Sequence, residues 1–206
     1  MSRAGAIARS VVSIVIVVTA LWLPPAWSAN ISEVDVHHDG DRYFLSLEAH
    51  LDAPPWAVFA VITDYENIHG LHRRIRESRI IRRIDPRTVE VFTVLKGCVA
   101  AVFCKSVRRV ERIVETPPTE LLATVIPGQS DLASGSVRWR LESSDAGTLL
   151  RYDSDMEPDF WVPGLLGDSL LQMSIRRTTE DMIQEVEIRA RALVVGEGEE
   201  LSREPS

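Results

Sequence analysis

The segment LDAPPWAVFAVITDYENI, residues 51–68, takes the chain from a strand into a helix. Leu51 ends an alternating run, and Pro54 and Pro55 stop the strand, because proline fixes the φ angle and suits the first turn of a helix. Apolar side chains then recur at helical spacing, at Val58, Phe59, Ile62 and Tyr65. This spacing predicts a short amphipathic helix that ends near Gly70.

Alternation of apolar and polar residues predicts strands on both sides of this segment. Residues 43–51 alternate, a shorter alternation at residues 34–36 precedes them, and the turn signal Asp39 and Gly40 lies between the two. We interpret both runs as one first strand that is bent or broken at residues 38–41. Six further strands are predicted after the helix, at residues 79–84, 88–96, 103–114, 120–126, 136–142 and 148–156.

The predicted strand at residues 136–142 has the clearest alternation. Val137, Trp139 and Leu141 alternate there with charged residues. This pattern is typical of an antiparallel sheet with one face in the core and one face in water.

The last predicted element is a helix of about 25–30 residues, because apolar side chains recur at steps of about 3.6. These side chains are Leu171, Ile175, Thr178, Met182, Val186 and Leu193. Charged residues, with Glu187 among them, are assigned to the opposite side. The concave face of the sheet is the expected partner of the apolar stripe. Residues 195–206 form an acidic tail that is predicted to be disordered.

The composition describes a foldable domain that follows a targeting segment. The chain has 206 residues, of which 45% are hydrophobic, with 23 Lys and Arg against 30 Asp and Glu, so broad nucleic-acid binding is not expected. Arg3 and Arg9 precede an apolar run at residues 11–23, and the small residues Ala26 and Ser28 follow it. This predicts a secretory signal peptide, residues 1–28, cleaved after Ser28, and a periplasmic or secreted protein. An uncleaved anchor is the alternative.

The two cysteines fall in the part of the chain that is predicted to be exported. Five residues separate Cys98 from Cys104. At the tip of a hairpin the two would face each other and form a disulfide, which oxidising compartments favour, whereas on one continuous strand they would be about 20 Å apart. We favour the hairpin. Its apolar tip, residues 99–103, is expected to gate a cavity, to touch a membrane, or to be buried near Trp56.

Several motifs resemble those of one superfamily. Besides residues 51–68, they are GTLLRY at residues 147–152, then Glu157 and Pro158, and a terminal helix that Pro163 introduces and that ends near Ala190. Together they resemble an exported bacterial member of the START-like, SRPBCC superfamily, of the polyketide cyclase/dehydrase and lipid transport type, over residues 31–194.

The resemblance implies an α+β helix-grip fold for a domain at residues 29–194. In this fold a curved antiparallel sheet wraps around a long C-terminal helix, and a short helix pair follows the first strand. The resemblance also implies a cavity for a hydrophobic small molecule or lipid. Large side chains assigned to its wall are Phe59, Phe92, Trp139, Tyr152, Met156, Leu171, Ile175 and Met182. The alternative is that these side chains simply pack a core.

The expected function is therefore that of an exported, monomeric binding protein for a hydrophobic molecule, with a lipid or isoprenoid carrier as one form. A cyclase-like enzyme that uses the same cavity is the alternative, and its polar candidates are Thr93, Arg108, Tyr152 and Ser154. No phosphate-binding or dinucleotide motif is present, and no cofactor is expected. His69 and His72 lack further ligands at suitable spacing, so no metal site is predicted.

Seven arginines lie between residues 73 and 87, with Glu77 and Asp85 as the acidic residues among them. A solvated edge strand explains this pattern if the charges prevent aggregation. Alternatively Arg79, Arg82 and Arg83 contact anionic lipid head groups or an acidic partner, which would make the protein an interaction module.

Overall fold

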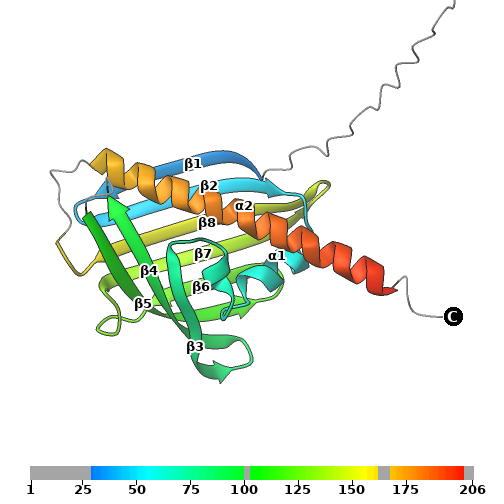
Figure 1. The fold of residues 1–206 in the computed structure, drawn as a ribbon, viewed down its shortest axis with the longest axis horizontal. Helices are drawn as coiled ribbons and strands as arrows, with labels where there is room; N and C mark the ends of the chain where they lie inside the picture. The colour runs from blue at the N-terminus through cyan, green and yellow to red at the C-terminus, as the bar shows by residue number, and fades with distance from the viewer. Residues whose placement is uncertain (1–28, 100–102, 162–167, 202–206) are drawn as a thin grey trace, which may run out of the picture.

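The structure is a computed structural model that describes residues 29–99, 103–161 and 168–201. The described chain forms one antiparallel sheet, a long helix and a short helix (Figure 1). The elements are β1 (Asn30–Asp39), β2 (Arg42–Leu51), α1 (Pro55–Ile62), the 3₁₀ turn η1 (Ile68–Gly70), β3 (Ile75–Asp85), β4 (Thr88–Val99), β5 (Phe103–Thr116), β6 (Glu120–Val125), β7 (Leu132–Ser144), β8 (Gly147–Pro158) and α2 (Asp168–Leu201). The predicted α+β helix-grip fold is confirmed. The predicted signal peptide and the centre of the apolar tip, residues 100–102, lie outside the described residues.

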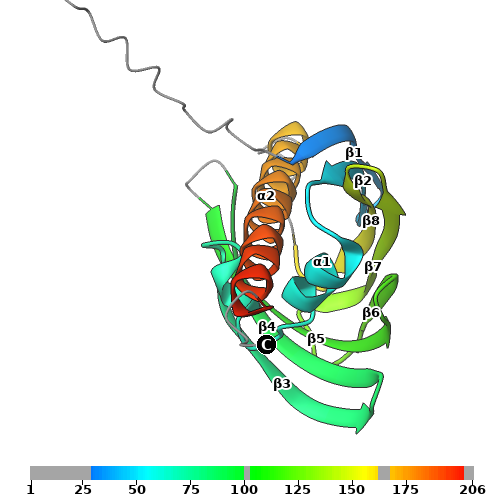
Figure 2. The ribbon, with the colours of Figure 1, turned by 90° about the vertical axis from the view of Figure 1, so that its right-hand side faces the viewer.

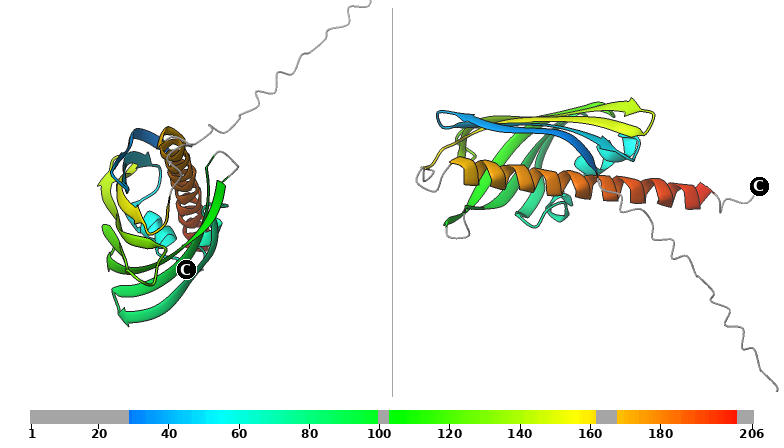
Figure 3. Two further views of the ribbon diagram at one scale, coloured as in Figure 1. Left: turned by 90° about the vertical axis from the view of Figure 1, so that its left-hand side faces the viewer. Right: turned by 90° about the horizontal axis from the view of Figure 1, so that it is seen from above.

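The eight strands form a single sheet in the order β1-β2-β8-β7-β6-β5-β4-β3, and all neighbours are antiparallel. Because β2 pairs with β8, the first hairpin joins the last one, and β1 and β3 become the two edges. The sheet curves around α2, which runs along its concave side with α1 beside it (Figures 2 and 3). The concave face is therefore the face that packs on the helices.

The first predicted strand is in fact two strands. β1 and β2 form a hairpin whose last pair joins Asp39 to Arg42, and Gly40 between them has a φ angle of +58°. A two-residue loop with positive φ reverses the chain completely. The chain is therefore broken at the predicted residues 38–41, but the prediction of a single strand was wrong. β3 begins at Ile75, earlier than the predicted start at residue 79.

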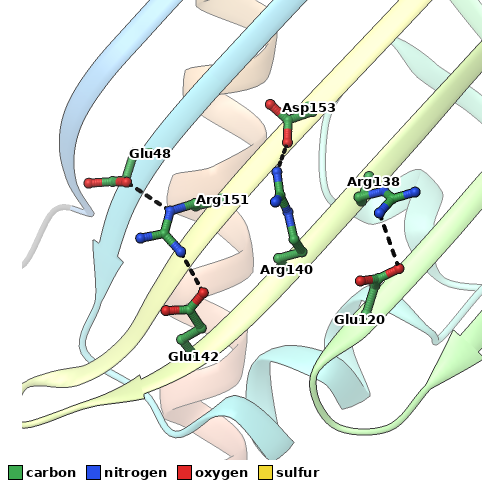
Figure 4. A network of polar contacts seen from close by, with 7 residues as sticks. All are labelled: Glu48, Glu120, Arg138, Arg140, Glu142, Arg151 and Asp153. Atoms are coloured by element: carbon green, nitrogen blue, oxygen red, sulfur yellow. Dashed lines mark hydrogen bonds and ion pairs between the residues drawn. The ribbon is translucent and has the colours of Figure 1, made fainter.

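The outer face of β2, β6, β7 and β8 carries interleaved charges (Figure 4). Ion pairs join Arg138 to Glu120, Arg140 to Asp153, and Arg151 to both Glu48 and Glu142. All these side chains are partly exposed, so each pair contributes at most about 1 kcal/mol to stability. Trp139 lies on the buried face of the same sheet, and this arrangement confirms the predicted sheet with one wet face.

α2 packs on the core through Ile183, Val186 and Ala190, none of which has any exposed surface. Glu187 was assigned to the polar side but is also buried. Its Oε1 accepts a hydrogen bond of 2.8 Å from the backbone N–H of Asp52, in the link between β2 and α1. The assignment was wrong because this N–H needs an acceptor inside the fold.

The C-terminal turns of α2 extend beyond the sheet (Figure 3). The helix ends at Leu201, so residues 195–201 are helical, although the sequence placed the start of a disordered tail at residue 195. Glutamates favour helix formation and continue it here. Among the described residues, no helix has both the length and the apolar character needed to cross a membrane.

The turn between β7 and β8 requires a glycine. Gly147 has a φ angle of +126°, and a Cβ there would collide with the carbonyl oxygen of Leu51 and lie 2.8 Å from the backbone nitrogen of Ala53. We expect Gly147→Ala to lower the free energy of unfolding in urea by about 3 kcal/mol, because strain and collision add. Gly40→Ala is the control, since nothing lies within 4 Å of its Cβ position, and it should lose about 1 kcal/mol. Equal losses would contradict the prediction.

Candidate functional site

A cavity of about 320 Å³ lies between the concave face of the sheet and α2. Most of its wall is apolar. Strands β4 and β5 contribute Val91, Leu95 and Val107, and α2 contributes Ile175 and Met182. These residues face inward because successive side chains of a strand point to opposite faces, and because side chains three or four apart on a helix share one side.

The structure places five of the eight predicted cavity residues in this wall. They are Trp139, Tyr152, Met156, Ile175 and Met182. The ring of Tyr152 meets the ring of Trp139 edge to face, with their centroids 4.8 Å apart. The side chain of Leu171 lies outside the described residues.

Phe59 and Phe92 do not line the cavity, and their assignment was wrong. Phe59 is buried in the core formed with α1. Phe92 points to the outer face, because its neighbour Val91 points inward and side chains alternate along β4. There the guanidinium of Arg79 lies over its ring at 4.6 Å.

A polar cluster of Thr93, Arg109 and Glu111 interrupts the apolar wall. Thr93 lies opposite Arg109 in the β4–β5 ladder, and Glu111 is two residues further along the same face of β5. Arg109 Nη2 is 3.1 Å from Glu111 Oε2, and the Glu111 side chain is only 5% exposed. Three atoms, Thr93 Oγ1, Arg109 Nε and Glu111 Oε1, have no hydrogen-bond partner among the described residues. The cluster therefore retains hydrogen-bonding capacity inside the cavity.

The sequence prediction named Arg108 as a polar candidate, whereas the ion pair contains its neighbour Arg109. Arg108 points outward and holds Asp131 through two hydrogen bonds of 2.7 and 3.2 Å. Arg109 is the arginine that faces the cavity, because one residue along a strand changes the face. Both faces of β5 mix arginines with valines, so alternation alone did not separate them. Thr93 and Tyr152 line the cavity, whereas Ser154 is buried next to Tyr152 without lining it.

Two tyrosines in the wall are hydrogen-bonding groups and not bases. Burial raises the pKa of Tyr152, so its hydroxyl stays protonated. Burial also raises the pKa of Tyr65, whose hydroxyl donates a 2.6 Å hydrogen bond to Glu115. Both therefore remain neutral at physiological pH.

Basic residues lie at the end of the cavity where β4 and β5 approach their connecting tip. Lys96 and Lys105 line this end, and the Lys105 ammonium lies 3.9 Å from the ring centre of Phe160. Arg74 donates a 2.8 Å hydrogen bond to Ser174 and so joins the link before β3 to α2. We call this end of the cavity the mouth.

The two cysteines lie beyond the mouth. The ladder pairs Cys98 directly with Cys104, so both lie on a hairpin, as the sequence indicates. Among the described residues there is no free cysteine. This register places the two residues opposite each other, as the proposed disulfide requires.

His72 is nearly buried under α2. Its Nδ1 accepts a 3.0 Å hydrogen bond from the backbone N–H of Arg74, and its Nε2 lies 3.6 Å from Asp181 Oδ2. Burial, assisted by Arg74 and Arg73 and opposed by Asp181, lowers the pKa of His72. Among the described residues, no three His, Cys, Asp or Glu side chains come together to hold a metal ion.

His72 should make stability depend on pH. Its pKa in the fold lies below the value of about 6.5 in the unfolded chain, so the unfolded chain takes up the proton first as the pH falls. The stability linked to neutral His72 is complete above about pH 6.5 and is lost as the pH falls through the folded pKa. We expect the free energy of unfolding in urea to fall as the pH is lowered from about pH 7 to about pH 5.

His72→Asn should flatten this dependence, because its amide oxygen can accept the Arg74 hydrogen bond without titrating. His50→Asn, at an exposed position, is the control and should leave the slope unchanged. Parallel stability curves for the wild type and H72N across this pH range would contradict the prediction.

An apolar cavity enclosed by a curved antiparallel sheet and one long helix defines the helix-grip class of proteins. Residues 45–187 match the family model described as polyketide cyclase / dehydrase and lipid transport, and the chain belongs to this family. The resemblance to the SRPBCC superfamily is thus confirmed.

Solved structures share the fold at low sequence identity. The Zhui aromatase/cyclase from Streptomyces sp. R1128 is 15% identical with a TM-score of 0.61, and the match covers 74% of this chain and 96% of that one. A START superfamily protein from Mycobacterium smegmatis is 17% identical with a TM-score of 0.55, covering 74% and 98%. Human STARD10 is 10% identical with a TM-score of 0.57, covering 77% and 73%. No curated protein matches the chain by sequence.

Proposed function

We propose that the protein binds a hydrophobic small molecule or lipid in the cavity between the sheet and α2. The observation that carries this proposal is the cavity of about 320 Å³, whose wall is apolar apart from a few buried polar groups. Pockets of this kind typically hold small ligands. Removal of apolar ligand surface from water would drive binding, at about 25 cal/mol per Å².

We propose further that the protein is exported from the cytoplasm and acts as a carrier of its ligand in the compartment that it reaches. Two observations support export. An apolar run follows Arg3 and Arg9, and Cys98 lies opposite Cys104 in the ladder, where an oxidising compartment would favour a disulfide.

A carrier needs only to shield its ligand from water and does not need a base in its cavity. Tyr65 and Tyr152, whose hydroxyls stay protonated, fit that role. The buried polar cluster favours a cyclase-like enzyme as the second candidate. Extraction after loading separates the two, because a carrier returns its ligand chemically unchanged.

Filling the cavity should weaken binding. Leu95 lines the cavity, whereas its neighbour Val94 pairs with outward-facing Arg108 and points to the other face. We expect Leu95→Trp to weaken binding of a neutral naphthylamine fluorophore by about tenfold or more, because the indole occupies the site. Val94→Trp places the same indole on the other face of the sheet, and this variant should bind normally. Titrations followed by fluorescence measure both.

If Leu95→Trp and Val94→Trp bind the fluorophore equally well, the cavity is not the binding site. Native mass spectrometry of protein purified from its own compartment provides a second measurement. An apolar molecule bound to the wild type and missing from the Leu95→Trp variant would support the proposal.

A carrier must also exchange its ligand with a membrane, and Arg79, Arg82 and Arg83 remain our proposed contact with anionic lipid. Arg82 already shares Glu90 with Arg112, and Arg79 pairs with Glu77. Both arginines are still more than half exposed, so they can reach a surface. Each basic group near an anionic surface contributes about 1 kcal/mol.

Replacing Arg79, Arg82 and Arg83 with serine should therefore abolish sedimentation with phosphatidylglycerol vesicles at low salt. The matched control replaces the three arginines of Figure 4, Arg138, Arg140 and Arg151, with serine. It removes the same charge from β7 and β8 instead of the β3 edge and should retain binding. Equal losses in both triple variants would show that net charge alone matters.

A further inference from the structure

The polar cluster of the cavity specifies which chemical group it can accept. Arg109 Nε–H is a donor and cannot accept, Glu111 Oε1 is an acceptor, and the Thr93 hydroxyl can be either. All three atoms are buried in the wall without a hydrogen-bond partner among the described residues. Buried polar groups lose free energy when they stay unpaired. A ligand group that pairs with them must therefore both accept from Arg109 and donate to Glu111.

The charge of the cluster narrows the choice of ligand group. Arg109 and Glu111 form an ion pair of 3.1 Å, so their formal charges cancel. A carboxylate would pair with Arg109 but face the negative charge of Glu111, and an ammonium would meet the reverse problem. Either ion would also lose its hydration on entering the cavity. An ester or ketone accepts without donating and would leave Glu111 Oε1 unpaired. A neutral hydroxyl or primary carboxamide satisfies both requirements.

The position of the cluster leaves apolar wall on both sides of it. Towards the mouth, Leu95 and Val107 form the next pair of the β4–β5 ladder. In the other direction the wall continues with Val91 and Ile113. Lys105 at the mouth is four residues from Arg109, or about 13 Å along the strand. The charged mouth is thus separated from the polar cluster by an apolar stretch, which suits a molecule with one polar group on an apolar body.

We propose that the ligand is an apolar molecule with a single neutral hydroxyl or primary carboxamide, seated on Thr93, Arg109 and Glu111. This inference rests on the proposed function, because it assumes that the cavity binds ligands. It excludes free fatty acids and alkylamines as preferred ligands.

A probe series with one chain length tests the inference on the wild-type protein. Dodecanol, dodecanamide, dodecanoate, dodecylamine and methyl dodecanoate compete with the neutral naphthylamine fluorophore. We expect the alcohol and the amide to bind about tenfold tighter than the other three. Preference for any of the other three, or equal binding of all five, would overturn the inference. In both cases the fluorophore still binds, so the proposed function survives. A fluorophore that does not bind the wild type overturns both.

Variants of the ion pair should change the preference in opposite directions. Glu111→Gln leaves the charge of Arg109 uncompensated, so dodecanoate should become the best ligand. Arg109→Gln leaves Glu111 alone and should favour dodecylamine. Arg108→Gln is the matched control, because the neighbouring arginine faces outward, and it should leave the order of the probes unchanged. Circular dichroism melts confirm that each variant folds. Folded variants that keep the wild-type order of probes would contradict the role of the pair.

Discussion

The packing of one helix against one curved sheet is the interaction on which the rest of the structure depends. α2 is fastened by Ile183, Val186 and Ala190, which have no exposed surface. The preceding turns carry Ile175 and Met182, which face the cavity. One helix thus divides its length between a fully packed part and a part that spans open space. Because the packed part fixes the helix axis, the other part can remain over the cavity without filling it.

The buried ion pair of Arg109 and Glu111 in the cavity has a desolvation cost that the fold must offset. Moving two charges out of water is expensive, and a pair of well-packed apolar residues at Arg109 and Glu111 would often be as stable or more so. The fold tolerates this cost because α1, α2 and the inner side of β7 and β8 form a continuous apolar core elsewhere. The backbone around the ion pair is also held in place by the β4–β5 ladder, which pairs the two strands along their whole length.

Much of the architecture is readable from local patterns, and the exceptions have physical causes. β7 alternates cleanly, so Trp139 could be placed inward from sequence. β5 carries arginines on both faces, because its outer face binds Asp131 and its inner face holds an ion pair. The two registers are one residue apart and equally polar, so periodicity cannot choose between Arg108 and Arg109. Glu187 is a different case, since its partner is the backbone of Asp52, which is distant in sequence. Side-chain type does not reveal a distant backbone group that needs an acceptor.

The pairing of β2 with β8 also constrains when the fold can form. Leu51 pairs with Thr148, and Tyr43 pairs with Met156, so the ladder joins residues roughly a hundred positions apart, a separation that slows folding. Until β8 is available, the β1–β2 hairpin has only its internal ladder, and isolated hairpins are marginally stable in water. The N-terminal hairpin is therefore an unfinished edge for most of the time in which the chain emerges.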